Sequence, residues 1–195
     1  MPTAAVNVWA ATLSGVADMN KKTSYLTFCA LVAALISALM VASFFPYLTY
    51  AVPAVAGAFI ILPLAELSKG YALLTYIASS MLVLFFAEPE AKLMYICFFG
   101  YYPVLKAVYE KIGSRVIEYI LKLLTFNGAV TLIYVGLTKL FGISLEGIGE
   151  YGKYGIIFLY AIGNIAFILY DICLTQLCGF YIYRLHDKIK RIMRF

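Results

Sequence analysis

The sequence places one carboxylate, that of Asp171, inside a long apolar segment. Residues 156–183 contain no other charged side chain, and Asp171 lies far from the charged residues that flank the segment at either end. An ionised carboxylate at bilayer depth costs several kcal/mol unless it faces other helices or a wet cavity. We therefore expect Asp171 to face the interior of a helix bundle.

Other polar residues share the helical face of Asp171. Asn164, Asp171 and Thr175 are separated by seven and four residues, a spacing that puts them on one side of a helix, with Tyr160 one turn before them. Asn127, in the preceding apolar segment, is a possible partner across the bundle. This stripe has two interpretations. Its members either fix helix packing through hydrogen bonds, or they bind a ligand, a proton or an ion.

Aromatic residues form a second group of candidates. The chain has 17 Tyr and 14 Phe, and Tyr47 and Tyr50 lie in an aromatic stretch between two apolar segments. Tyrosines at such places often form a belt at the membrane surface. Tyr47 and Tyr50 could equally line the mouth of a pocket for a flat ligand, so both remain candidate ligand-binding residues.

A ladder of small residues marks the first apolar segment. Ala30, Ala34, Ala38 and Ala42 recur at steps of four and form one helical face without bulky side chains. Such a face lets another helix approach closely. The second helix could belong to this chain or to a separate protein.

Motifs of known enzyme chemistry are missing from the sequence. It contains no H-E-x-x-H, G-x-S-x-G or Walker A motif, its four cysteines form no C-x2-C pair, and its one histidine, His186, lies in a basic tail. We therefore expect no catalytic residue, no metal site, no cofactor and no enzymatic activity. Active transport would then depend on a partner or on an ion gradient.

The elements that must position these residues are transmembrane helices. Of the 195 residues, 64% are hydrophobic and only 13% are charged, against roughly 45–50% and 25% in soluble domains. The basic residues form short clusters between apolar runs, which indicates membrane topology and not nucleic-acid binding. The predicted fold is an all-α membrane protein in the cell membrane, with the lipid bilayer around it.

Six apolar runs approach the length of about 20 residues that a helix needs to cross the hydrocarbon core. They cover residues 25–45, 51–65, 71–87, 93–109, 116–140 and 154–183. The second is short and carries Pro53 and Pro63, while Gly100 and Pro103 should bend the fourth. The prediction is a six-helix bundle formed by residues 21–183.

Basic residues predict the orientation, because they are retained on the cytoplasmic side. With both termini inside, only Lys92, Lys139 and Lys153 of the 15 Lys and Arg residues fall outside. Residues 184–195 then form a basic cytoplasmic tail, and the glycine-rich stretch 141–153 is an outer loop or lid. Residues 1–20 are predicted to be an extension of uncertain status, since Met19 resembles a natural start.

The length, the topology, the alanine ladder and the short second segment Val52-Pro53-Ala54-Val55-Ala56-Gly57 resemble one known family. This family comprises the substrate-binding S subunits of energy-coupling factor (ECF) transporters. The resemblance implies a six-span protein that binds a vitamin or a metal ion. It also implies that the alanine face docks onto a transmembrane coupling subunit driven by two ATPases. The chain lacks a substrate signature of that family.

Two functional hypotheses follow. In the first, the chain is a solute-binding uptake subunit whose pocket is formed by the outer halves of the last three spans and the outer loops. Asp171 would hold a cationic or hydrogen-bond-donating group of an unknown small molecule. In the second, it is a non-transporting scaffold or regulatory protein of an envelope complex, and Asp171 is a packing residue. An ion-coupled carrier acting alone is less favoured, because no inverted repeat is visible.

Overall fold

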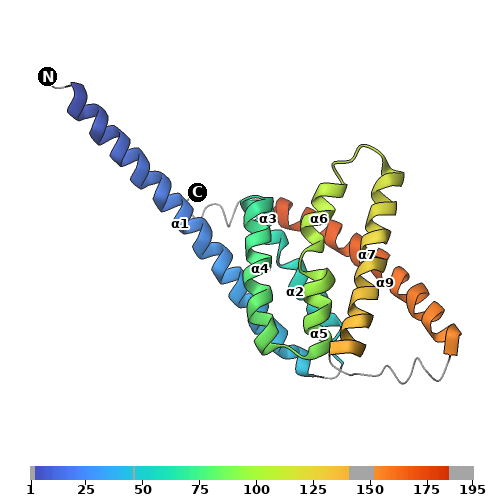
Figure 1. Cartoon of the computed structure of the whole chain (residues 1–195). Coiled ribbons are helices and arrows are strands. Elements are labelled where there is room, and N and C mark those ends of the chain that lie inside the picture. The colour runs from blue at the N-terminus through green and yellow to red at the C-terminus, as the bar shows by residue number, and fades with distance from the viewer. Residues whose placement is uncertain (1–2, 46, 141–151, 185–195) are drawn as a thin grey trace.

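The computed structural model describes residues 3–45, 47–140 and 152–184, and within these residues it is helical throughout, without strands (Figure 1). Four helices are long and apolar enough to cross a membrane, and they cover Lys22–Phe44, Lys69–Phe86, Arg115–Leu137 and Tyr160–Arg184. The prediction of an all-α chain with several such helices is confirmed. Most of the predicted outer loop, residues 141–151, and the tail at residues 185–195 lie outside the described residues.

The helices follow one another along the chain with short connections. They are α1 (Thr3–Val41), η1 (Ala42–Phe44), α2 (Ala51–Ala58), α3 (Ile61–Glu66), α4 (Lys69–Phe86), α5 (Pro89–Met94), η2 (Tyr95–Phe99), α6 (Tyr102–Tyr109), α7 (Arg115–Leu140) and α9 (Gly152–Arg184). The predicted first, third, fifth and sixth runs therefore correspond to α1, α4, α7 and α9. The second and fourth are each divided into shorter pieces.

Helix α1 packs against α4 and continues beyond the bundle. Val32, Ile36 and Met40 form its buried side, and the rings of Tyr25 and Tyr71 meet edge to face at 5.6 Å. The predicted N-terminal extension is, from Thr3 onward, part of this same helix, whose N-terminal part projects away from the other helices (Figure 1).

The second apolar segment is broken between α2 and α3. Pro63 has no N–H to donate to the carbonyl of Phe59, so the regular hydrogen-bond ladder cannot continue there. The amides of Phe59 and Ile60 instead bind carbonyls three residues earlier, those of Ala56 and Gly57, at 3.2 and 3.1 Å. The tighter turn re-aims the chain and explains why this segment does not form one long helix.

The fourth apolar segment is interrupted at the place where Gly100 and Pro103 were predicted to bend it. The turn η2 is π-helical, and the amide of Gly100 binds the carbonyl of Tyr95, five residues earlier, at 2.8 Å. Pro103 then stands in the first turn of α6, where its missing N–H removes no hydrogen bond. The segment is thus divided into α5, η2 and α6.

The two interrupted segments touch each other at the centre of the bundle. A Cβ atom on Gly57 would overlap the backbone carbonyl of Phe99, so α2 and η2 approach as closely as glycine allows. On one side of η2, Tyr95 belongs to a core shared with α1, α2 and α4. On its other side, Phe98 belongs to a second core shared with α3, α6, α7 and α9.

Candidate functional site

Asp171 lies in a buried charge cluster that joins α6, α7 and α9. Its Oδ1 accepts hydrogen bonds from the Tyr102 hydroxyl at 2.7 Å and from Lys106 Nζ at 2.5 Å, and its Oδ2 accepts one from Lys122 Nζ at 3.1 Å. Asp171, Lys106 and Lys122 are only 8%, 7% and 3% exposed. The carboxylate predicted to face the bundle interior does so, and three donors of the same chain already surround it.

Two glutamates complete this charge cluster at its rim. Glu110 Oε1 lies 3.0 Å from Lys106 Nζ, and Glu118 Oε1 lies 2.7 Å from Lys122 Nζ, each one helical turn from its lysine. The five side chains carry two positive and three negative charges, and each charge has an opposite neighbour within 4 Å. Such mutual pairing is what allows charged groups to remain buried.

The other members of the predicted polar stripe are also bonded within the protein. Asn127 and Asn164 exchange side-chain hydrogen bonds at 3.1 and 3.2 Å, which ties α7 to α9. The hydroxyls of Thr131 and Tyr160 lie 2.8 Å apart, and Thr175 Oγ1 donates to the carbonyl of Asp171 at 3.0 Å. These contacts provide hydrogen bonds for the stripe without a ligand.

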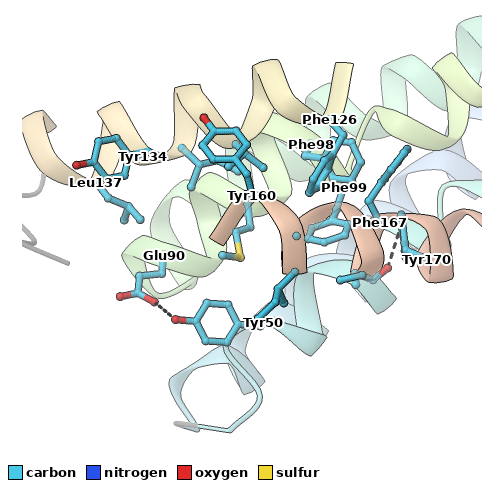
Figure 2. Close-up of a pocket in the computed structure, with 17 residues that line it drawn as sticks. Tyr50, Glu90, Phe98, Phe99, Phe126, Tyr134, Leu137, Tyr160, Phe167 and Tyr170 are labelled. Carbon is cyan, nitrogen blue, oxygen red and sulfur yellow. Dashed lines mark hydrogen bonds between the residues drawn. The ribbon is translucent and has the colours of Figure 1, made fainter. Parts of the chain in front are cut away.

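A separate pocket of about 570 Å³ lies between α2, α5, η2, α7 and α9 (Figure 2). Its walls are almost entirely apolar and aromatic. The lining residues are Tyr50, Ala54, Glu90, Met94, Phe98, Phe99, Phe126, Val130, Ile133, Tyr134, Leu137, Tyr160, Ile162, Gly163, Ala166, Phe167 and Tyr170. The rings of Phe126 and Phe167 stack with their centroids 4.8 Å apart and their planes only 13° from parallel.

The pocket has one charged side chain, Glu90, near one end. Its Oε2 accepts a hydrogen bond from the Tyr50 hydroxyl at 3.1 Å, a contact that Figure 2 shows apart from the Phe98, Phe99 and Phe167 rings. Burial, followed by the nearby Glu90 and Glu88 carboxylates, raises the pKa of Tyr50. The phenol therefore stays protonated and serves as the donor in this pair.

The predicted ligand-binding residues divide between these places. Tyr50 and Tyr160 line the pocket. Asn127, Asn164, Asp171 and Thr175 are not among its lining residues, and Tyr47 is 97% exposed. A ligand-binding role for these five remains a prediction, and the structure supplies internal partners for the four polar residues within the bundle.

Sequence reasoning missed Lys106, Lys122 and Glu90. The positive-inside count places both lysines on the cytoplasmic side, although both fall inside predicted spans. A basic residue inside a span needs an acidic partner in the bundle, and this requirement could have indicated Asp171. Glu90 lies between the third and fourth apolar runs, where a charged side chain is expected in any connecting turn. Its place beside Tyr50 depends on how α2 and α5 pack, and no sequence pattern indicates that contact.

The alanine ladder of α1 is largely uncovered. Ala30, Ala34 and Ala38 are exposed, whereas Ala42 is half-buried against the first core. The described part of the chain therefore places no helix on Ala30, Ala34 and Ala38. This leaves that face open to lipid or to a partner.

The described residues contain no group of three or more His, Cys, Asp and Glu side chains that could hold a metal ion. The four cysteines are free thiols, and Cys29 is buried between α1 and α4. No protein-family model, no curated protein and no solved structure matches this chain.

Proposed function

We propose that this chain is a multi-pass solute-binding subunit of the cell membrane, which captures a small molecule from the outer side. The observation that carries the proposal is the aromatic pocket. Its volume of about 570 Å³ lies within the range of roughly 300–1,000 Å³ that is usual for small-molecule sites. An apolar wall with a few polar groups is also the usual composition of such sites.

The pocket is built on the two interrupted segments, which supports a role in solute binding. Ala54 comes from α2, Met94 from α5, and Phe98 and Phe99 from η2. Irregular backbone at membrane depth is tolerated where it is packed against protein or lines a cavity. In transporters, interrupted apolar segments often form the substrate site.

The proposed topology has six spans with both termini in the cytoplasm. The pairs α2 with α3, and α5 with α6, then cross the bilayer as interrupted spans beside the four long helices. The start of α2 and the start of α5 fall on the outer side, together with Tyr50 and Glu90. The polar end of the pocket would therefore face the outside, from which the solute arrives.

Transport would rely on separate proteins, as the resemblance to ECF S subunits implies. The exposed Ala30, Ala34 and Ala38 offer a face on which a transmembrane coupling subunit with its ATPases can dock. The same face also favours the alternative of a non-transporting scaffold or regulatory protein in an envelope complex. The two functions differ in whether the pocket holds a solute.

Mass spectrometry of compounds released from the gently purified full chain tests the proposal. Val130 is half-buried and lines the pocket, whereas Leu132, on the same helix, is exposed. Val130→Trp should fill the pocket and abolish the bound compound, while Leu132→Trp adds the same side chain outside it. Wild type and Leu132→Trp should release the same compound.

Co-purified ATPase subunits would identify the transporter branch of the proposal. An empty wild-type chain whose melting temperature rises with no fraction of a metabolite extract would instead favour the scaffold. Release of equal amounts of compound from Val130→Trp and wild type would show that the compound binds elsewhere, and would contradict the pocket as the solute site.

A further inference from the structure

The charge distribution of the pocket selects one chemical class of ligand. Among the lining residues that the structure describes, Glu90 is the only charged one, so these residues offer a ligand a negative group and no positive one. The nearby Lys92 donates its ammonium to the carbonyl of Leu84 at 3.0 Å. Lys106 and Lys122 are engaged in the charge cluster around Asp171. Within the described part of the chain, a carboxylate or phosphate ligand would therefore meet no basic side chain in the pocket lining.

The Glu90 carboxylate has capacity for another donor. Within the described part of the chain it accepts one hydrogen bond, from Tyr50, and forms no ion pair, whereas an ionised carboxylate can accept about four hydrogen bonds. The neighbouring Glu88 is outside the lining, and its carboxylate already accepts from Thr49 at 2.9 Å. A protonated amine placed here would gain both charge pairing and hydrogen bonds.

The aromatic walls suit the remainder of such a ligand. The stacked rings of Phe126 and Phe167, with Phe98 against both at 5.3 and 5.7 Å, form an apolar wall for a flat ring system. Tyr160 and Tyr50 present further rings nearer Glu90 (Figure 2). Aromatic faces also attract cations, which favours an amine over a neutral group of the same size.

We propose that the pocket binds an organic cation, a ring-containing amine whose ammonium group pairs with Glu90 and whose ring lies against Phe126 and Phe167. This inference rests on the proposed function, because it takes the pocket to be a ligand site. It differs from the sequence-based hypothesis in the anionic residue used: Glu90 replaces Asp171, whose carboxylate is already paired with two lysines.

Three naphthalene probes with the same ring and different charges test the inference. They are 1-naphthylmethylamine, 1-naphthalenemethanol and 1-naphthoic acid, titrated calorimetrically into the full chain in phosphatidylcholine nanodiscs, with empty discs subtracted. We expect the amine to bind at least tenfold more tightly than the alcohol, and the acid more weakly than either. Val130→Trp should abolish binding of all three probes, whereas Leu132→Trp should preserve it.

Substitutions at the two glutamates assign the charge preference. Glu90→Gln keeps the size of the side chain and should lower amine affinity to that of the alcohol while leaving alcohol affinity unchanged. Glu88→Gln, a control outside the lining, should change amine affinity no more than about twofold. Repetition in phosphatidylethanolamine discs identifies the source of the amine, since weaker probe binding there would indicate that a lipid headgroup competes for the site.

The outcomes separate this inference from the proposed function. Pocket-dependent binding of the alcohol or the acid as tightly as the amine, or an amine preference that survives Glu90→Gln, overturns the organic-cation assignment but leaves a solute site. Failure of all three probes, together with an empty wild-type chain, overturns both.

Discussion

At the scale of single residues, Asp171 and its partners decide how the last helix is fixed in the bundle. Its carboxylate receives donors from α6 and α7, while its own backbone carbonyl accepts from Lys106 at 3.2 Å. Buried ion pairs add little net stability relative to well-packed apolar residues, but removing one partner is costly because the other charge remains buried. The charge cluster therefore favours one arrangement of α6, α7 and α9 over slipped alternatives.

Asp171→Asn should destabilise the isolated protein. Asparagine retains the size but not the charge, and its amide nitrogen cannot accept, so one of the two buried lysines would lose its side-chain acceptor and the other its anionic partner. A hydrogen bond to a charged group is worth about 1.5–3 kcal/mol. Since Glu110 and Glu118 still contact the lysines, we expect a loss of about 3 kcal/mol in the free energy of unfolding. Denaturant titration in detergent measures it.

Thr175→Val is the matched control, because the Thr175 hydroxyl bonds only to the carbonyl of Asp171 in its own helix. It should change stability by no more than about 0.5 kcal/mol. Adding Lys106→Met to Asp171→Asn should recover part of the loss, since it removes the other charge of the shortest pair. A folded Asp171→Asn protein of wild-type stability with a tenfold weaker pocket ligand would restore the ligand-binding role of Asp171.

The location of Asp171 in the interior was predictable, and its surroundings were not. One charge in a long apolar run must avoid lipid, which indicates the interior whatever the neighbouring helices are. To identify Lys106 as its partner, one must know the rotational position of α6 about its own axis. That rotation is set by the π-turn at Tyr95–Phe99, which shifts the helical phase and which no apolar periodicity reveals.

At the scale of elements, the contact between α2 and η2 depends on the missing side chain of Gly57. Glycine to alanine in a helix interior usually stabilises by up to about 1 kcal/mol. At Gly57 the added methyl would overlap the Phe99 carbonyl, and backbone cannot move aside without separating the two segments. We expect Gly57→Ala to destabilise by roughly 1–3 kcal/mol, the usual cost of overpacking.

Gly128→Ala provides the comparison, since a Cβ at Gly128 on α7 meets nothing within 4 Å. It should leave stability unchanged or raise it by up to about 1 kcal/mol. Thermal unfolding followed by circular dichroism measures both variants. Equal effects at the two glycines would contradict the close packing of the interrupted segments.

The alanine face of α1 gives a second prediction at this scale. Ala34 is exposed and Ala33 is 2% exposed against the bundle. Ala34→Leu should leave the melting temperature of the isolated chain within about 2 °C, which corresponds to no more than about 1 kcal/mol, and abolish pull-down of a membrane partner. Ala33→Leu should lower the melting temperature by overpacking. Collapse of the isolated Ala34→Leu protein would show that the face is packed internally.

The sequence predicts the four long helices better than it predicts the two interrupted segments. Long apolar runs predicted α1, α4, α7 and α9, because span length is imposed by the bilayer. Prolines and Gly100 marked the two interrupted segments, but proline position alone does not say whether a helix kinks or divides. The pocket was predictable only in part, as Tyr50 and Tyr160, because its walls come from five elements whose mutual rotation is a property of the packed bundle.

At the scale of the whole molecule, the remaining question is how the bundle sits in the bilayer. In the proposed six-span topology, Ser68 follows the second span and faces the cytoplasm, whereas Ser144 follows the fifth span and faces outward. Ser68 is exposed just before α4, and Ser144 lies outside the described residues. A chain in which α2 with α3, or α5 with α6, failed to cross would place the flanking basic clusters on the wrong side.

Single cysteines at these two serines test the orientation in a background without Cys29, Cys97, Cys173 and Cys178. A membrane-impermeant maleimide applied to intact cells should label Ser144→Cys at once and Ser68→Cys only after permeabilisation. The cysteine-free parent sets the background in both conditions. Labelling of both positions from the same side would rule out six spans. Labelling of Ser68→Cys in intact cells would place the start of α5, one crossing of α4 away, in the cytoplasm, and would remove Glu90 from the face at which a solute is captured.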